Sequence, residues 1–207
     1  MRFCKREIEK YRYFAKMVFT GAVCLLMCAG CGEKQTQDKA VNIAYFPNIT
    51  HSQALMIKNE GTLEKALGDD VQVNWTSFNA GPDEVTALFS GDIDIGYIGP
   101  IPAISANVKS KGDVVVVSGC SDGGMMLLAS PDSGIETVSD LAGKNVAVPQ
   151  IGNTQHLVFL DLLAENDLAT TEAGGNVTVT ATANAYILQL MQNGEIEAAC
   201  VPEPWAE

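Results

Sequence analysis

The stretch Val146–Gln155, which reads Val-Ala-Val-Pro-Gln-Ile-Gly-Asn-Thr-Gln, decides the fold. Its apolar start predicts a strand, which Pro149 and Gly152 end. Asn153 or Thr154 then caps a helix with an apolar series of its own. A helix that begins where a strand ends presents unpaired N–H groups and the positive end of its dipole, and both suit an anion. The stretch therefore predicts a small-anion site.

Strand and helix patterns alternate along the rest of the chain. The expected strands are 41–46, 71–76, 93–98, 114–117, 125–129, 145–148, 177–182 and 197–201, with helices between most of them. Such alternation is typical of a parallel sheet with helices on both faces. The expected class is therefore α/β.

Two segments, 88–96 and 191–199, repeat one pattern: a helix end, a glycine, an acid-Ile-acid triplet and a strand. Each follows a strand and an Asn-Ala loop, Asn79-Ala80 in one and Asn184-Ala185 in the other. This punctuation is common in α/β proteins, so chance similarity is the alternative. A true repeat predicts two lobes of like design, with 120–124 as the first crossing between them.

The N-terminal residues have the pattern of a secretory leader, in which six basic residues precede an apolar run over 17–30. About fourteen apolar residues are too few for an ordinary membrane span and fit a signal peptide. The small residues before Cys31 resemble the lipobox of bacterial lipoproteins, although Cys28 stands where leucine is usual. We expect a signal peptide over 1–30, a lipidated Cys31 and a polar tether over 31–40. A plain secretory cleavage nearby is the alternative.

Either cleavage places the protein outside the cytoplasm, and a lipid on Cys31 would anchor it to the membrane surface without spanning it. Removal of residues 1–30 takes away six of the 13 basic and two of the 25 acidic residues, so the net charge falls from −12 to about −16. No arginine is left. Such a chain is not expected to bind nucleic acid or to clamp phosphate through guanidinium groups.

Two cysteines, Cys120 and Cys200, follow Cys31. They are too few for a disulfide framework or a zinc site. We expect two buried free thiols; one disulfide is the alternative.

Loops at the carboxyl ends of the strands are the expected ligand site, as in other open α/β sheets. The loops that qualify carry mainly neutral donors: 47–53, 79–82, 99–100, 120–124, 152–155 and 203–205. Four or five hydrogen bonds to a charged group, at about 1.5–3 kcal/mol each, reach the roughly −8 kcal/mol of micromolar binding. Neutral donors can therefore hold an anion in this acidic chain, since surface charges are screened beyond about 8 Å.

Each of these loops also has a structural interpretation. The segment 152–155 is then only a well-capped helix start, His51 a solvated loop residue, and Trp205 a part of the core. The sequence has no Gly-x-Ser-x-Gly elbow, no P-loop and no His-Glu-x-x-His. Its two histidines leave few bases near neutral pH. We therefore expect no enzyme, no catalytic residue, no cofactor and no metal site.

Five segments, in the same order, resemble the aliphatic-sulfonate, nitrate and taurine group of ABC-transporter substrate-binding proteins. They are Tyr-Phe-Pro-Asn-Ile-Thr-His (45–51), Phe-Asn-Ala-Gly-Pro (78–82), Gly-Tyr-Ile-Gly-Pro (96–100), Val-Pro-Gln-Ile-Gly-Asn-Thr-Gln (148–155) and Val-Pro-Glu-Pro-Trp (201–205). The resemblance runs from about Val41 to the end of the chain.

This resemblance implies a type II periplasmic-binding-protein fold, with two α/β lobes (41–121 and 122–207), a hinge and a cleft between them. A small anion such as a sulfonate, taurine or nitrate would be captured by lobe closure. It would pass to a membrane permease driven by a cytoplasmic ATPase, and the receptor would be a monomer. The alternative is a pyrimidine-precursor (thiamine-pathway) binding protein or an enzyme on the same fold.

The resemblance also implies which residues line the cleft. These are His51, Ser52, Gln53, Asn79, Ala80, Gly81, Gly99, Gly152, Asn153, Thr154 and Gln155, with Glu203 and Trp205. Family members run on past the Pro-Glu-Pro-Trp segment and recross to the first lobe. We therefore expect a C-terminally truncated chain with an incomplete second lobe. Such a chain should bind ligand poorly, and tight binding by calorimetry would overturn that expectation.

Overall fold

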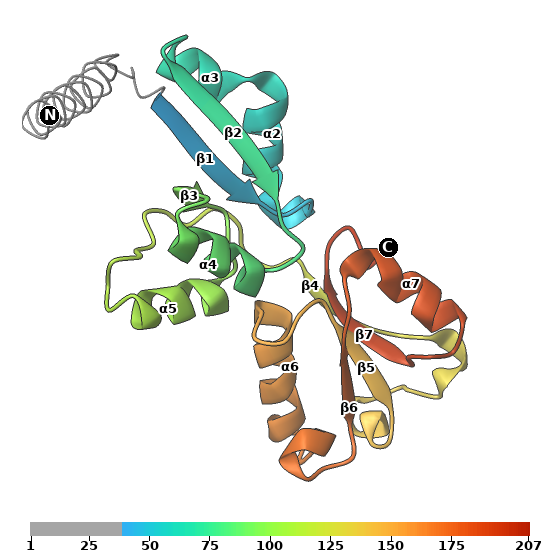
Figure 1. The fold of residues 1–207 in the computed structure, drawn as a ribbon. Coiled ribbons are helices and arrows are strands. Elements are labelled where there is room, and N and C mark those ends of the chain that lie inside the picture. The colour runs from blue at the N-terminus through green and yellow to red at the C-terminus, as the bar shows by residue number, and fades with distance from the viewer. Residues whose placement is uncertain (1–38) are drawn as a thin grey trace, which may run out of the picture. The chain divides into compact units, whose positions relative to one another are not determined.

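The computed structural model describes residues 39–207, which form one compact unit. The predictions for the leader, Cys31 and most of the tether lie outside the described residues. Two sheets organise the unit, sheet A with the order β2-β1-β3 and sheet B with the order β4-β7-β5-β6 (Figure 1). No helix within residues 39–207 is long and apolar enough to cross a bilayer.

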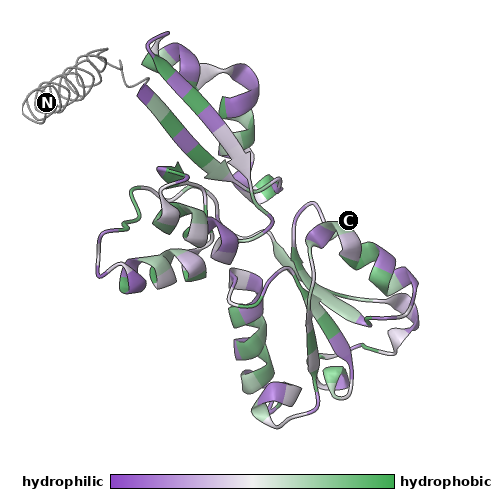
Figure 2. Ribbon diagram, viewed as in Figure 1, coloured by the Kyte–Doolittle hydropathy of each residue, from purple (hydrophilic) through white to green (hydrophobic). Residues whose placement is uncertain are grey.

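Sheet A is parallel and is built from the first half of the unit. Its strands are β1 (Lys39–Tyr45), β2 (Val71–Ser77) and β3 (Ile95–Gly96), and its helices are η1 (Ile49–His51), α2 (Ser52–Glu60), α3 (Thr62–Leu67), α4 (Gly81–Ser90) and α5 (Pro100–Lys109). In the register Ile43 lies between Trp75 and Ile95. The first half of β2 alternates between hydrophobic and hydrophilic residues, as a strand with one covered face should (Figure 2).

Sheet B is mixed. Its strands are β4 (Met125–Ala129), β5 (Asn145–Val148), β6 (Thr178–Ala181) and β7 (Ala198–Pro202), and its helices are η2 (Pro131–Ser133), η3 (Val138–Leu141), α6 (Thr154–Glu165), η4 (Thr171–Ala173) and α7 (Asn184–Gln192). Strand β5 runs parallel to β6 and β7, but β4 runs antiparallel to β7. The prediction of a purely parallel sheet is wrong here, because the chain enters sheet B through an antiparallel edge strand, a common addition to parallel sheets.

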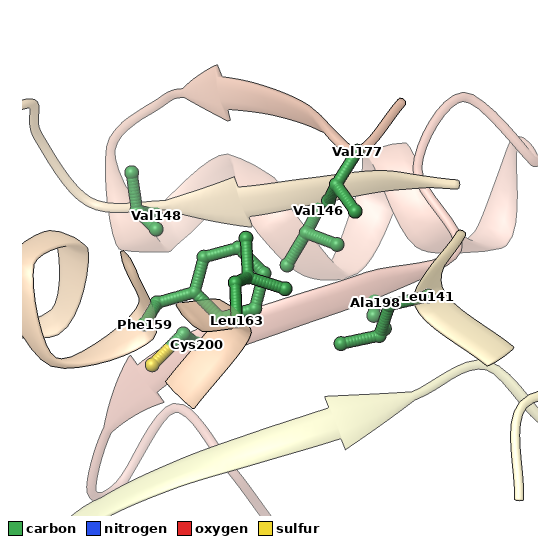
Figure 3. Packing of buried hydrophobic residues seen from close by; sticks show 8 residues of the cluster. All are labelled: Leu141, Val146, Val148, Phe159, Leu163, Val177, Ala198 and Cys200. Atoms are coloured by element: carbon green, nitrogen blue, oxygen red, sulfur yellow. The ribbon is translucent and has the colours of Figure 1, made fainter. Parts of the chain in front are cut away.

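Helix α6 is held against sheet B by apolar side chains. Phe159 and Leu163 lie one turn apart on the face of α6 that packs on β5 and β7, and each is 1% exposed (Figure 3). Burial of such a side chain stabilises the fold by roughly 1.5–3 kcal/mol. The valines that start the deciding stretch, Val146 and Val148, are fully buried in the same cluster. This packing fixes the start of α6 at the carboxyl end of β5.

The predicted internal repeat is confirmed in the geometry of the two segments. Helices α4 and α7 both end next to a glycine with a positive φ, 80° at Gly91 and 73° at Gly194. In each half, an acidic side chain of the segment accepts a hydrogen bond from a backbone N–H of the sheet's central strand. These bonds are Asn42 N to Asp94 Oδ2 (2.7 Å) and Asn145 N to Glu197 Oε2 (2.8 Å). The two halves therefore share one design.

The apolar run 114–117 is not a strand, which corrects the prediction. No regular structure runs from residue 115 to residue 124. Val115, Val116 and Val117 are 62%, 70% and 75% exposed. A β-branched run favours the extended conformation, but a strand also needs a neighbour to pair with. None of the strands described for sheet A lies beside this run.

Both described cysteines are free. Cys200 in β7 is buried as predicted, and its burial raises the pKa of the thiol to about 12. Cys120 lies in the segment that joins the two sheets and is exposed, so the prediction of a second buried thiol is wrong.

Candidate functional site

A cavity of about 140 Å³ lies where loops from sheet A and sheet B meet. Its lining includes the starts of four helices, at Ala80 for α4, Gly99 for α5, Asn153 for α6 and Asn184 for α7. The deciding stretch of the sequence therefore does end at a cavity. Its contribution is the first turn of α6.

The helix starts around the cavity carry few side-chain caps. Asn153 caps α6 with its own side chain, whose Oδ1 accepts a hydrogen bond from His156 N at 2.8 Å. The starts of α4, α5 and α7 have no such cap. Their free N–H groups, together with the positive ends of the helix dipoles, make the cavity a favourable place for negative charge.

No side chain of Asp, Glu, Lys or Arg lines the cavity within the described chain. His51 does line it, and burial lowers the pKa of its imidazole to about 4. The ring is therefore neutral at physiological pH. Its Nδ1 accepts a hydrogen bond from Phe46 N at 2.9 Å, which leaves the proton on Nε2. His51 thus offers one neutral N–H donor.

Three polar bonds join the sheet A half and the sheet B half around the cavity. The Asn79 side chain makes two of them, from its Nδ2 to Pro149 O and from Asn184 N to its Oδ1, both at 3.2 Å. The third runs from Gln150 Nε2 to Asp83 Oδ1 at 2.7 Å. Because both polar atoms of Asn79 are engaged, this residue holds the cavity walls together.

Two polar atoms of lining residues are enclosed and have no hydrogen-bond partner, Thr154 Oγ1 and Asn184 Oδ1. The Thr154 hydroxyl packs so closely on Gly99 that a Cβ at position 99 would lie 2.3 Å from Oγ1. Glycine is therefore required at position 99 for the two walls to approach this closely.

The structure brings eight of the thirteen predicted site residues to the cavity. They are His51, Asn79, Ala80, Gly81, Gly99, Asn153, Thr154 and Gln155. The other five, Ser52, Gln53, Gly152, Glu203 and Trp205, do not line it.

Four of these five support the walls through hydrogen bonds. Gln53 Nε2 donates to Cys120 O (2.7 Å), Gly152 N to His156 Nδ1 (3.1 Å), Glu203 N to Gly124 O (2.9 Å) and Trp205 Nε1 to Asn48 Oδ1 (2.9 Å). Ser52, the first residue of α2, directs its hydroxyl to Gln53 Oε1 at 3.5 Å.

Asn184 is the main lining residue that sequence reasoning did not select. The internal repeat could have identified it, because Asn184 occupies the place in the second half that Asn79 holds in the first. The crossing 120–124 was recognised as a qualifying loop, and Cys120, Ser121, Gly123 and Gly124 of this loop line the cavity. Within the described residues there is no group of three or more His, Cys, Asp or Glu side chains that could hold a metal ion.

Comparisons with known proteins agree with this geometry. The model of the NMT1-like family matches residues 34–207. A protein named putative aliphatic sulfonates-binding protein, from Escherichia coli K12, is 31% identical over 152 residues, which are 73% of this chain and 46% of that protein. The taurine-binding periplasmic protein of the same organism is 28% identical over 169 residues, 81% of this chain and 50% of that protein. The chain thus spans about half the length of the curated relatives it matches.

Solved structures of similar fold include periplasmic binding proteins. The periplasmic aliphatic sulphonate binding protein SsuA from Escherichia coli matches with a TM-score of 0.57 and 26% identity, over 81% of this chain and 55% of that one. The periplasmic nitrate-binding protein NrtA from Synechocystis PCC 6803 matches with a TM-score of 0.62 and 16% identity, over 81% and 47%. The α/β periplasmic-binding-protein fold expected from the sequence is confirmed.

Proposed function

Because the chain belongs to the NMT1-like family, we propose that it is part of the extracytoplasmic solute-binding component of an ABC importer, which captures a small anion such as a sulfonate, taurine or nitrate. The observation that carries this proposal is the cavity, where four helices begin and no acidic side chain lines the wall. Relatives named as sulfonate- and taurine-binding proteins support it.

The ligand-binding residues we propose are the eight predicted ones that line the cavity, together with Asn184. Gln53, Gly152, Glu203 and Trp205 would act by holding the walls in place. We assign residues 41–121 to one lobe and 122–207 to the other, in line with the separate sheets A and B.

The partners follow from the same proposal. The receptor would work as a monomer, deliver its solute to a permease driven by a cytoplasmic ATPase, and stay at the membrane surface through a lipid on Cys31. Because the relatives reported above are named as binding proteins, solute capture is favoured over an enzyme of the same fold.

Thermal unfolding of the full chain, purified in a mild detergent, tests this function. The panel contains alkanesulfonates, taurine, nitrate, bicarbonate and a thiamine-pathway pyrimidine, each against sodium chloride of equal ionic strength, because salts alone also shift stability. One of the anions should raise Tm by about 3–6 °C at ten times its Kd. A panel in which no anion exceeds the chloride control contradicts the proposal.

Variants at two glycines locate the binding site. Gly99→Ala places a methyl group against Thr154 inside the cavity and should abolish the ligand-induced rise in Tm. Gly119→Ala is the matched control, since nothing lies within 4 Å of a Cβ at that position. A rise that survives in Gly99→Ala places the anion elsewhere.

A further inference from the structure

Asn184 lies at the start of α7 and faces the cavity with a side chain that is 5% exposed. Its backbone N–H is already engaged by Asn79 Oδ1 at 3.2 Å. Its side-chain Oδ1 is enclosed and has no hydrogen-bond partner. Buried carbonyl oxygens are nearly always paired, so an enclosed acceptor at a cavity wall points to a donor that comes with the ligand.

Thr154 Oγ1, at the start of α6, is the second enclosed atom without a partner. The two atoms have different needs. A threonine hydroxyl can donate to an anionic oxygen, whereas a side-chain carbonyl oxygen can only accept. The protein supplies no donor to Asn184 Oδ1, because the nearest polar side chain across the cavity, Asn79, is held by Pro149 and Asn184 itself.

We propose that Asn184 is a specificity-determining residue, and that the preferred ligand carries an O–H or N–H donor beside its anionic group. The anionic group lies at the start of α6, where the Thr154 hydroxyl and helix N–H groups donate to it. The donor group lies at the start of α7, where Asn184 Oδ1 accepts from it. This inference rests on the proposed function, and it narrows the ligand to a bifunctional anion rather than a simple oxyanion or an alkyl sulfonate.

The size and charge of the cavity agree with a ligand of this kind. A volume of about 140 Å³ admits a chain of only a few heavy atoms. Because no carboxylate lines the wall in the described residues, the donor is read by a neutral carbonyl. A hydroxyl and an ammonium group share the required chemistry, and the experiment separates them.

Three sulfonates of nearly equal shape test the inference on the full chain: propane-1-sulfonate, 2-hydroxyethanesulfonate and 2-aminoethanesulfonate. Their Kd values are measured by ligand-observed NMR, which detects millimolar binding. At least one donor-bearing sulfonate should bind about tenfold or more tightly than propane-1-sulfonate. Equal Kd values for all three overturn the inference and leave the proposed function standing. No binding by any of them overturns both.

Variants then assign the preference to a residue. Asn184→Ala should abolish the preference while the Kd of propane-1-sulfonate stays within about twofold. Asn184→Asp keeps the acceptor and adds charge, and should favour the ammonium ligand over the hydroxyl ligand. Thr154→Ala should weaken all three sulfonates alike. A donor preference that persists in Asn184→Ala refutes the role of this residue, and the comparison of ligands on the unmodified chain does not depend on any variant folding.

Discussion

Glu84 in α4 is a carboxyl group that the fold buries without a partner. The side chain is 2% exposed, its Oε2 has no hydrogen-bond partner, and it lies so close to Gly96 that no Cβ would fit there. Burial raises the pKa of Glu84 from 4.5 to about 8. The group is therefore largely protonated at neutral pH, and its neutral form is what the interior tolerates.

The free energy of unfolding should fall as the pH rises from 6.5 to 8. The pKa of Glu84 is higher in the folded chain than in the unfolded one, so its contribution is complete below pH 4.5 and is lost as the pH rises toward 8. His51 acts in the opposite sense, because its folded pKa of about 4 makes its contribution complete above 6.5 and lost below. Above pH 6.5 the loss from Glu84 remains, about 2 kcal/mol over this range.

Urea unfolding at pH 6.5 and pH 8 measures this loss. Glu84→Gln should remove most of the difference between the two pH values, since glutamine does not titrate. Glu60→Gln is the control, because Glu60 is exposed at the end of α2. A pH dependence that is the same in Glu84→Gln and in the unmodified chain would refute the assignment.

The edge strand β3 and the inner strand β7 occupy equivalent places in the internal repeat but differ in their neighbours. Strand β7 is paired on both sides, by β4 and β5. Strand β3 pairs with β1 alone, and in the described part of the chain its outer edge carries no strand. Ile95 in β3 is 45% exposed, whereas Ala198 to Val201 in β7 are fully or almost fully buried.

Amide hydrogen exchange should therefore be faster in β3 than in β7, by about tenfold or more, because edge amides open to solvent without breaking a second ladder. Mass spectrometry of peptides that cover 93–98 and 196–202 measures both rates in one experiment. Peptides from β1 serve as the internal control, since β1 is paired on both sides in sheet A. Equal protection of β3 and β7 would show that something covers the outer edge of β3.

Local patterns were enough to predict several elements. Strands β4 and β5 have the predicted bounds, because each is a short apolar run between turn residues. The run 114–117 has the same local pattern and is not a strand, because strand formation depends on a partner distant in sequence. The start of α6 was predictable from Asn153, whose cap bond is local. The unpaired state of Asn184 Oδ1 was not, because it depends on contacts across the cavity.

The cavity as a whole depends on how the sheet A half and the sheet B half are held together. Glu203 and Trp205 show how far this lies from local sequence. Both were expected in the cleft, yet Trp205 Nε1 donates to Asn48 Oδ1, a residue 157 positions away, and so ties the C-terminal segment to the loop after β1. Asn79 makes the corresponding contact on the inner wall. Such long-range hydrogen bonds give a side chain a structural role that its motif does not reveal.

Asn79→Ala should loosen the contact between the two halves without unfolding either. The substitution removes the acceptor of Asn184 N and the donor to Pro149 O, so the free energy of unfolding should fall by about 1–3 kcal/mol. The amide proton of Asn184 should then exchange with solvent faster, which NMR detects directly. Asn107→Ala is the matched control, because Asn107 donates to Val114 O within the sheet A half. Unchanged exchange at Asn184 would mean that other contacts hold the walls, and the closed cavity would then not depend on Asn79.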